Sequence, residues 1–168
     1  GYGGGVFVSK TATFTMNGNA TISGNSAYID STDNYRKNSG GGVQVYGGNF
    51  IMNGGSIRDN MAENGAGVYV GESDSTLGTF TMNGGTITNN KVIKGNGGGV
   101  YVLGTFEIAN GAQVLNNLRQ DTSDNVYLTT GKTFRINGKL TGGVHSIGVS
   151  AADTPAEGNP VTIATAAT

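Results

Sequence analysis

The sequence has no cysteine, only two prolines and few charged residues. Without cysteine the chain can form neither a disulfide framework nor a thiolate metal site, although secretion is not excluded. Charged residues make up 12% of the chain, about half of the usual share of roughly 25%, and they form no long blocks. Nucleic-acid binding needs clustered lysine and arginine, so that class of function is excluded. No apolar run approaches the ~20 residues of a membrane span.

Glycine is abundant instead. It occupies 31 of the 168 positions, well over twice the roughly 7% typical of proteins, and with so little proline the chain is not collagen-like. The length is sufficient for one domain with a core. The chain begins at Gly1 without methionine, and a repeat starts almost at once. We therefore expect a segment of a longer protein, whose targeting signal would lie outside it.

Nearly the same short sequence motif recurs along the chain. "GTFTMNGGTITNN" (Gly78–Asn90) is matched by "ATFTMNGNATISGN" (Ala12–Asn25) and "GNFIMNGGSIRDN" (Gly48–Asn60), and more weakly by "GTFEIANGAQVLNN" (Gly104–Asn117). A triplet with valine at its first position, usually after glycine, precedes each copy. The spacings of the Asn-Gly pairs are 36, 30, 27 and 27 residues, which indicates a constant frame with insertions, at Asn17, Asn53, Asn83, Asn110 and Asn137.

Each repeat contains three short stretches that alternate apolar and variable residues, the period of a half-buried strand. Stacking of one repeat on the next at the ~4.8 Å strand spacing explains why the same residue type returns at the same place. A β-hairpin or a β-sandwich would tolerate short strands but does not require this identity. The sequence thus predicts an all-β, right-handed, single-stranded parallel β-helix (a solenoid) of about five coils with three short strands each.

The expected core column begins with Val6, Val8, Phe14, Met16 and Ile22 and repeats coil by coil. The glycines before each valine triplet are expected to allow a positive φ or a close approach between coils. Asparagines at the other corners are expected to tolerate the left-handed region and to stack their amides along the axis.

The pattern weakens after Leu140. We expect residues 1–141 to form the β-helix repeats and residues 142–168 to form either a degenerate terminal coil or the start of the next module. Two strands are predicted in this last part, over Val144–Val149 and Val161–Ala164, with a polar loop between them.

Several of these words resemble the repeats of bacterial surface proteins. They are "GGGV" (Gly40–Val43 and Gly97–Val100) and "GAGV" (Gly65–Val68), together with "ISGN", "IRDN", "ITNN" and "VLNN". The chain is similar in these words to right-handed parallel β-helix proteins of the adhesin and polymorphic outer-membrane protein type, within the pectate-lyase-like superfold. The resemblance implies a β-helix over most of the chain, and it implies no particular activity, because this fold hosts both binding proteins and polysaccharide-degrading enzymes.

No residues form a recognisable catalytic or metal-binding constellation. Glu107 and Arg135 are predicted to lie at equivalent outward positions of adjacent coils, as a solvated cross-strand pair rather than a catalytic pair. His145 is interpreted as an ordinary surface residue. The "DSTDN" of Asp30–Asn34 lacks the spacing of a calcium loop and is interpreted as a polar loop. We therefore predict no catalytic residue, no metal and no cofactor.

The outward position of the first strand carries mostly aromatic residues. It is predicted to form an exposed ladder on one face, and this ladder is the candidate ligand-binding site: Phe7, Gln44, Tyr69, Tyr101 and Tyr127. Two interpretations compete. Aromatic residues favour strands and pair well across coils, which explains the pattern without a ligand. A flat aromatic stripe would also serve as a platform for sugar rings or for a partner protein.

A second surface is predicted to carry threonine in pairs. Regular Thr-x-Thr arrays on a flat solenoid can order water, so ice binding is considered as a remote alternative. The array is broken by Ile51, Arg58, Glu107 and Leu115, and ordinary strand threonine is the favoured interpretation of Thr13, Thr15, Thr79, Thr81, Thr86 and Thr88.

These observations favour a non-enzymatic, extracellular or cell-surface module of a bacterial adhesin-like protein, serving as a rigid binding surface or stalk. The alternative is a segment of a carbohydrate-active β-helix enzyme, a polysaccharide lyase or hydrolase. The expected partners are a glycan or a protein of the host or cell surface, with no nucleic acid and no membrane insertion. The open strand edges of the end coils also predict end-to-end self-association.

Overall fold

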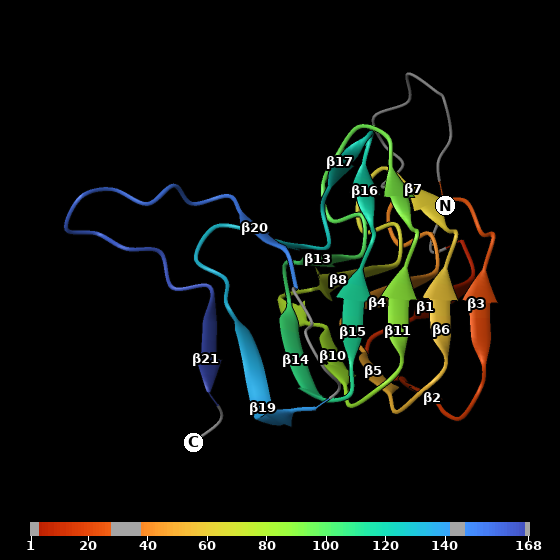
Figure 1. Ribbon diagram of the computed structural model, residues 1–168. Coiled ribbons are helices and arrows are strands. Elements are labelled where there is room, and N and C mark those ends of the chain that lie inside the picture. Colours follow the sequence, from red (N-terminus) through yellow and green to blue (C-terminus); the bar gives the residue numbers. More distant parts are fainter. Residues whose placement is uncertain (1–3, 28–37, 142–146, 167–168) are drawn as a thin grey trace.

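The structure, a computed structural model, describes residues 4–27, 38–141 and 147–166. These residues form strands and no helix, so none of them belongs to a helix that could cross a membrane. The strands of successive repeats lie side by side in a stack of coils, as Figure 1 shows. The chain is therefore all-β and folds as a parallel β-helix, which confirms the predicted fold class.

Two sheets of six main strands each run the length of the stack. We name the first sheet A; its strands, in spatial order, are β1 (Val6–Val8), β4 (Val43–Tyr46), β8 (Val68–Ser73), β13 (Val100–Val102), β18 (Val126–Leu128) and β20 (Val149–Ala151). Sheet B contains β2 (Thr13–Met16), β5 (Asn49–Met52), β10 (Thr79–Met82), β14 (Thr105–Asn110), β19 (Phe134–Leu140) and β21 (Ala164–Ala166). The valine triplets form sheet A. The stretches with phenylalanine and, two residues later, methionine or isoleucine form sheet B in the first five coils.

Two shorter sheets complete the coils. Sheet C consists of β3 (Thr21–Ser23), β6 (Ser56–Arg58), β11 (Thr86–Thr88) and β15 (Gln113–Leu115). Sheet D consists of β7 (Met61–Ala62), β12 (Lys91–Val92), β16 (Leu118–Arg119) and β17 (Thr122–Ser123). Pairing between successive coils is parallel in all four sheets, and like residues lie opposite one another, for example Phe50, Phe80 and Phe106.

Sheet D is a fourth strand position that the sequence did not predict. It appears in the second, third and fourth coils, between the asparagine that ends each repeat and the glycine corner of the next coil, where no strand was predicted. Each of its first two strands buries one small apolar side chain, Ala62 or Val92, in a separate cluster with Ala66. Two-residue strands are too short to show an alternating pattern, and for this reason they escape sequence analysis.

Two insertions form antiparallel hairpins. One follows sheet A in the third coil, where β8 pairs with β9 (Thr76–Leu77). Its turn residues Asp74 and Ser75 have φ of 47° and 62°, the left-handed values that a tight hairpin turn requires. The other hairpin joins β16 to β17.

The last described segment continues the stack. Strand β20 pairs in parallel with β18, and β21 pairs in parallel with β19. Both strands lie toward the end of, or just beyond, the stretches predicted for them, and residues 144–146 of the first stretch lie outside the described residues. Sheets A and B therefore extend one coil further than the repeat is visible in the sequence.

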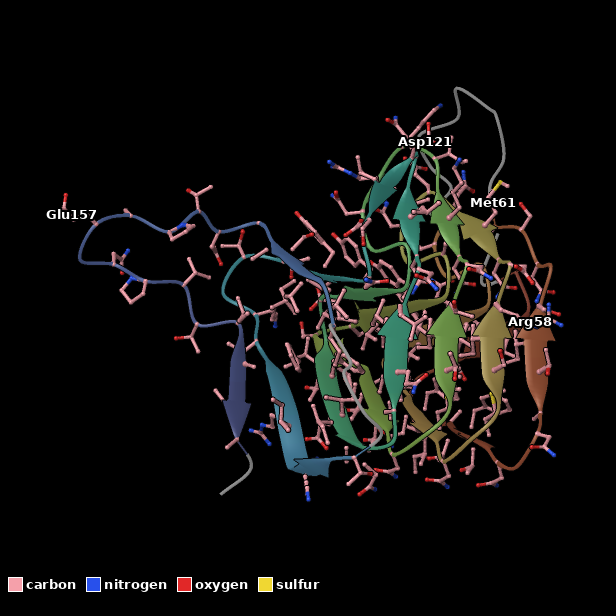
Figure 2. The ribbon with its side chains drawn as sticks, viewed as in Figure 1. Arg58, Met61, Asp121 and Glu157 are labelled. Atoms are coloured by element: carbon pink, nitrogen blue, oxygen red, sulfur yellow. The ribbon has the colours of Figure 1, made fainter. Side chains whose placement is uncertain are left out.

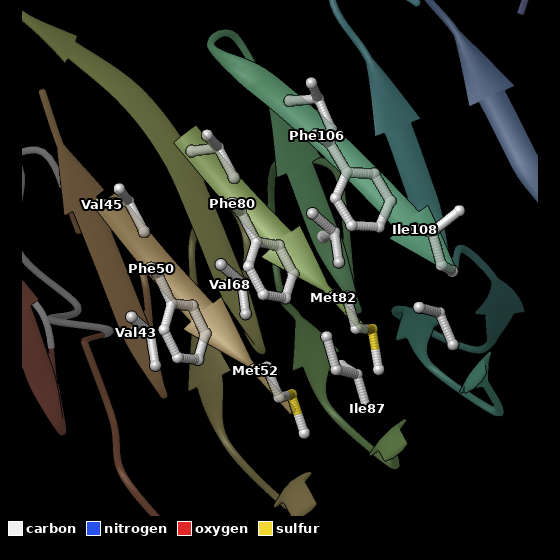
Figure 3. Close-up of a cluster of buried hydrophobic side chains, with 14 of the residues drawn as sticks. Val43, Val45, Phe50, Met52, Val68, Phe80, Met82, Ile87, Phe106 and Ile108 are labelled. Atoms are coloured by element: carbon white, nitrogen blue, oxygen red, sulfur yellow. The ribbon is translucent and has the colours of Figure 1, made fainter. Parts of the chain in front are cut away.

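A column of phenylalanine rings forms the centre of the core. Phe50, Phe80 and Phe106 are fully buried, and their ring centroids lie 4.8 Å and 5.2 Å apart with nearly parallel planes. Met52 and Met82 form the next column, and the valines of sheet A face both columns (Figure 3). The predicted core is confirmed at Val8 and Met16, which are buried, whereas Val6, Phe14 and Ile22 in the first coil are only partly buried against it.

A ladder of asparagine amides runs inside the stack beside this core. The Nδ2 atom of each donates to Oδ1 of the next, at 2.9 Å for Asn25 to Asn60, Asn60 to Asn90, and Asn90 to Asn117. The same Oδ1 atoms also accept the backbone N–H of the preceding asparagine. The predicted amide stacking is thus confirmed.

The predicted left-handed conformation is confirmed at the corner asparagines Asn89, Asn110 and Asn116, with φ between 52° and 56°. Along the amide ladder it belongs to the residue before each ladder asparagine. Asp59, Asn89 and Asn116 have φ between 56° and 57°, and Gly24 has φ of 69°. This turn directs the following side chain inward, where its amide replaces the backbone partners that the corner would otherwise lack.

The amide ladder ends at a residue that does not belong to the repeated sequence. The fifth copy has no equivalent asparagine, and Asn125 takes over: its Oδ1 accepts both the backbone N–H and Nδ2 of Asn117, at 2.9 Å and 3.1 Å. Asn125 directly precedes the valine triplet, the place that glycine occupies in the earlier coils. The final amide of the ladder is thereby satisfied.

The glycine at that place is needed because the coils approach closely. A Cβ atom on Gly67 would lie 2.5 Å from the carbonyl oxygen of Gly99, 2.8 Å from Ile87 Cγ2 and 3.1 Å from Asn90 Nδ2. Gly65, two residues earlier, has φ of 59°, so the corner uses glycine for both of the predicted reasons.

We expect Gly67→Ala to lower the free energy of unfolding by about 2–3 kcal/mol, because the added methyl group meets a backbone carbonyl that cannot move without displacing a coil. Gly111→Ala is the matched control, since its Cβ atom would lie 3.5 Å from its nearest neighbour and its φ is not positive. Urea unfolding of both variants measures the difference. Equal losses in the two would show that the glycine corner is not sterically required.

Candidate functional site

The outward residues of sheet A form the continuous row that the sequence predicted. The register places each beside the next in adjacent strands: Phe7, Gln44, Tyr69, Tyr101 and Tyr127, followed by Ser150. Successive side chains of a strand point to opposite faces, so the valines on either side point into the core while this row points out.

The row is not uniformly exposed, which corrects the sequence-based expectation. Phe7 is 39% exposed, but Gln44 is only 2% exposed and Tyr69 only 9%. The chain covers this row as it turns into each strand: a Cβ atom on Gly40 would lie 2.6 Å from Gln44 Cβ, and one on Gly65 would lie 2.8 Å from Tyr69 Cβ. The alternating pattern indicates which side of a strand faces outward, and it does not indicate what else lies over that side.

The Tyr69 ring is also packed along its own strand. A Cβ atom on Gly71 would lie 2.4 Å from Tyr69 Cε1, so the ring lies over the position where Gly71 has no side chain. An aromatic ring that covers a strand glycine shields the exposed backbone and stabilises the sheet. Tyr69 therefore has a structural role that is sufficient to explain its presence.

The three tyrosines form a stack, which we call the tyrosine ladder. The ring centroids of Tyr69 and Tyr101 lie 5.1 Å apart with planes 14° from parallel, and those of Tyr101 and Tyr127 lie 5.3 Å apart at 26°. Each ring thus packs against the face of the next. The predicted flat platform would need open ring faces. Beyond the stack, Tyr69 adjoins the buried Gln44, whereas Tyr127 adjoins the exposed Ser150.

The hydroxyl groups of Tyr69 and Tyr101 are uncharged at physiological pH. Burial, and then the nearby Tyr101, Glu72 and Tyr46, raises the pKa of Tyr69 to about 12. Burial followed by Tyr127 raises the pKa of Tyr101 as well. A raised phenol pKa means that the hydroxyl stays protonated, so neither residue is suited to act as a nucleophile or a base near neutral pH. The surface offers apolar rings and neutral hydroxyl groups.

Glu107 and Arg135 lie opposite one another in adjacent strands, as predicted. Glu107 Oε1 lies 3.6 Å from Arg135 Nη1, and Asn137 Nδ2 donates to Glu107 Oε2 at 2.8 Å. A glycosidase needs two carboxyl groups facing the same bond, at about 5–9.5 Å from each other. Glu107 instead faces the guanidinium of Arg135 and the amide of Asn137.

Two more acidic residues lie at separate projections of the molecule, as Figure 2 shows. Asp121 lies at the β16–β17 turn, and Glu157 lies in the loop between β20 and β21. Asp121 pairs with Lys91 at 3.2 Å on an exposed surface. In the described part of the chain, no three histidine, cysteine or acidic residues gather where they could bind a metal ion. The polar loop predicted at Asp30–Asn34 and the surface residue His145 lie outside the described residues.

The paired threonines are divided between two sheets. Thr13 and Thr79 lie on sheet B, whereas Thr86 and Thr88 lie on sheet C, so the single predicted surface is two surfaces. On sheet B the row that contains Thr15 and Thr81 is interrupted by Ile51 and Glu107, as expected. No continuous threonine array is formed among the described strands.

Sequence analysis missed a cleft at the far end of sheet A. It has a volume of about 540 Å³ and lies between the turn that follows β18 and the loop that joins β20 to β21. Its lining includes Lys132, Thr133, Asp153, Thr154, Asn159 and Thr162. The only signal in the sequence was the polar loop after Val149, and nothing there indicated that it faces the turn around Gly131.

No family model, no curated protein and no solved structure matches this chain. Its class rests on the fold: stacked parallel coils, with an internal asparagine ladder and a phenylalanine core, define a parallel β-helix repeat protein.

Proposed function

We propose that this chain is a non-enzymatic, extracellular or cell-surface module of a bacterial adhesin-like protein, which binds a glycan or a surface protein through the tyrosine ladder. The observation that carries the proposal is the stack of neutral rings on sheet A, which ends at Tyr127. Flat aromatic surfaces with polar hydroxyls make good contacts with sugar rings and with protein partners.

Two further features support a binding role. Strand pairing ties every coil to the next, and the amide ladder adds to it from Asn25 to Asn125. The tyrosine ladder is therefore carried by a stiff scaffold, and little order has to be gained on binding. Two of the carboxyl groups lie beside cations, Glu107 beside Arg135 and Asp121 beside Lys91.

The test compares the intact chain with Tyr127→Ala on a glycan array and on intact cells. We expect the substitution to weaken binding at least about tenfold, because it removes the ring that carries the contact. Stability should fall by only about 0.5–1.5 kcal/mol, since Tyr127 is partly exposed and stacks on one side. Tyr69→Ala is unsuitable, because that ring is buried and its loss would disturb the fold.

Phe7→Ala is the matched control. Phe7 is an aromatic residue of the same outward row at the opposite end of the stack, and its removal should leave binding within about twofold of the intact chain. Release of reducing sugar or of an unsaturated product from a bound polysaccharide would overturn the proposal in favour of an enzyme. Binding that survives Tyr127→Ala would remove the tyrosine ladder from it.

A further inference from the structure

The two ends of the tyrosine ladder have different neighbours. At the first end, Tyr69 is covered and adjoins the buried Gln44. At the other end, the strand beyond Tyr127 carries Ser150, which is exposed and has no ring. Within the described part of the chain, Tyr101 provides the only ring contact of Tyr127. Among the described residues no ring stacks on the side of Tyr127 that faces Ser150, and we call this its open side.

The cleft begins close to this open side. Tyr127 and Ser150 lie opposite one another, and the cleft lining starts two residues after Ser150, at Ala152. Two residues of a strand span about 7 Å. The cleft thus begins about 7 Å along the strand direction from the Tyr127–Ser150 pair, a separation that a single elongated ligand can span.

A hydrogen bond ties the two walls of the cleft together. Asp153 Oδ2 accepts the backbone N–H of Gly131 at 2.7 Å, which ties the β20–β21 loop to the turn after β18. Gly131 has φ of 71°, and a Cβ atom placed there would meet nothing within 4 Å. The volume of about 540 Å³ falls within the range typical of small-molecule sites, about 300–1,000 Å³.

The chemistry of the lining is polar and balanced in charge. It contains one ammonium group, Lys132, and one carboxylate, Asp153, together with the amide of Asn159 and the hydroxyl groups of Thr133, Thr154 and Thr162. The Lys132 ammonium pairs with no carboxylate among the described residues. Alternating donors and acceptors without net charge match a ligand that carries many hydroxyl groups and no charge of its own.

We infer that Tyr127 and this cleft form one binding site for a neutral oligosaccharide, in which one sugar ring stacks on Tyr127 and the following ring enters the cleft. The inference rests on the proposed binding function and specifies its ligand class and its location. Lys132 and Asn159 donate to ring hydroxyl groups, Asp153 accepts through its second oxygen, and Thr133 donates or accepts. Tyr127 supplies contact area, and the cleft supplies orientation and selectivity.

The experiment measures binding of tetrasaccharides of glucose, mannose and N-acetylglucosamine by calorimetry, with a galacturonate tetrasaccharide as the charged comparison. The intact chain should bind at least one neutral tetrasaccharide, and should bind the matching disaccharide about tenfold more weakly, because the shorter ligand cannot reach both parts of the site. Thr133→Val and Lys132→Gln should each raise Kd about tenfold, since each removes hydrogen bonds made only with the ligand.

Lys139→Gln is the matched control, because Lys139 is an exposed lysine of β19 that does not line the cleft; it should change Kd by no more than about twofold. Tighter binding of the galacturonate would overturn the inferred ligand class. If Tyr127→Ala abolishes binding while both cleft substitutions leave Kd unchanged, the inference fails and the proposed binding function stands. If Tyr127→Ala has no effect on the binding of any saccharide or of cells, both fail.

Discussion

Replacement of Asn90 by alanine is expected to lower the free energy of unfolding by at least about 3 kcal/mol. Asn90 is fully buried, and its Oδ1 accepts hydrogen bonds from the backbone N–H and from Nδ2 of Asn60. Its Nδ2 donates to the carbonyl oxygens of Ile57 and Thr88 as well as to Asn117. Alanine leaves several buried groups without partners in two neighbouring coils, and each unsatisfied group costs about 1–3 kcal/mol.

Asn83→Ala tests whether burial is the cause. Asn83 is in the same coil and also belongs to an amide row, in which its Nδ2 donates to Asn53 Oδ1 at 2.9 Å, but this row lies at a solvent-exposed corner. Water can replace the lost partner there, so we expect a loss below about 1 kcal/mol. Guanidinium unfolding followed by circular dichroism gives both values. Similar losses for the two variants would refute the view that the buried amide ladder stabilises the fold more than the exposed amide row does.

Phe80→Ala is expected to lower the free energy of unfolding by about 3–5 kcal/mol, the cost typical of removing a fully buried phenylalanine ring. Phe80 is fully buried between the rings of Phe50 and Phe106, at centroid distances of 4.8 Å and 5.2 Å. Strand pairing holds the coils on either side at their spacing, so the stack cannot collapse into the space that the ring leaves. The cavity penalty therefore adds to the lost hydrophobic transfer energy.

Phe80→Leu separates the two contributions. Leucine fills part of the space and retains apolar contact, so the loss should fall to roughly half of the alanine value. Thermal and urea unfolding measure both variants. A Phe80→Ala variant that lost less than about 1 kcal/mol would mean that the coils do close around the gap, and that strand pairing holds them less firmly than the registers indicate.

Sequence reasoning identified the features that stacking repeats in every coil. The phenylalanine column, the amide ladder and the glycine corner were all expected, because a position that meets its own equivalent at the strand spacing is restricted to the same residue type each time. Gly42, Gly67 and Gly99 illustrate this restriction, since each would bring a Cβ atom against a backbone oxygen of the following coil.

The features that were missed depend on segments that vary between coils. The burial of Gln44 and Tyr69 comes from the chain that turns into each strand of sheet A, and sheet D comes from two-residue strands in the insertions. Asn125 could not be identified as the end of the amide ladder, because it stands eight residues after Asn117 and reaches it only through the β16–β17 hairpin.

The candidate site likewise combines a feature that the sequence predicted with features that depend on the tertiary structure. The outward row from Phe7 to Tyr127 followed from the alternating pattern alone, since the two-residue period of a strand determines which side chains share a face. The open side of Tyr127 and the cleft beside it were decided by tertiary structure, because they depend on where the loop between β20 and β21 lies relative to the turn around Gly131. A repeat specifies its neighbours one strand spacing away, whereas contacts between non-repeating loops are specified only when the chain folds.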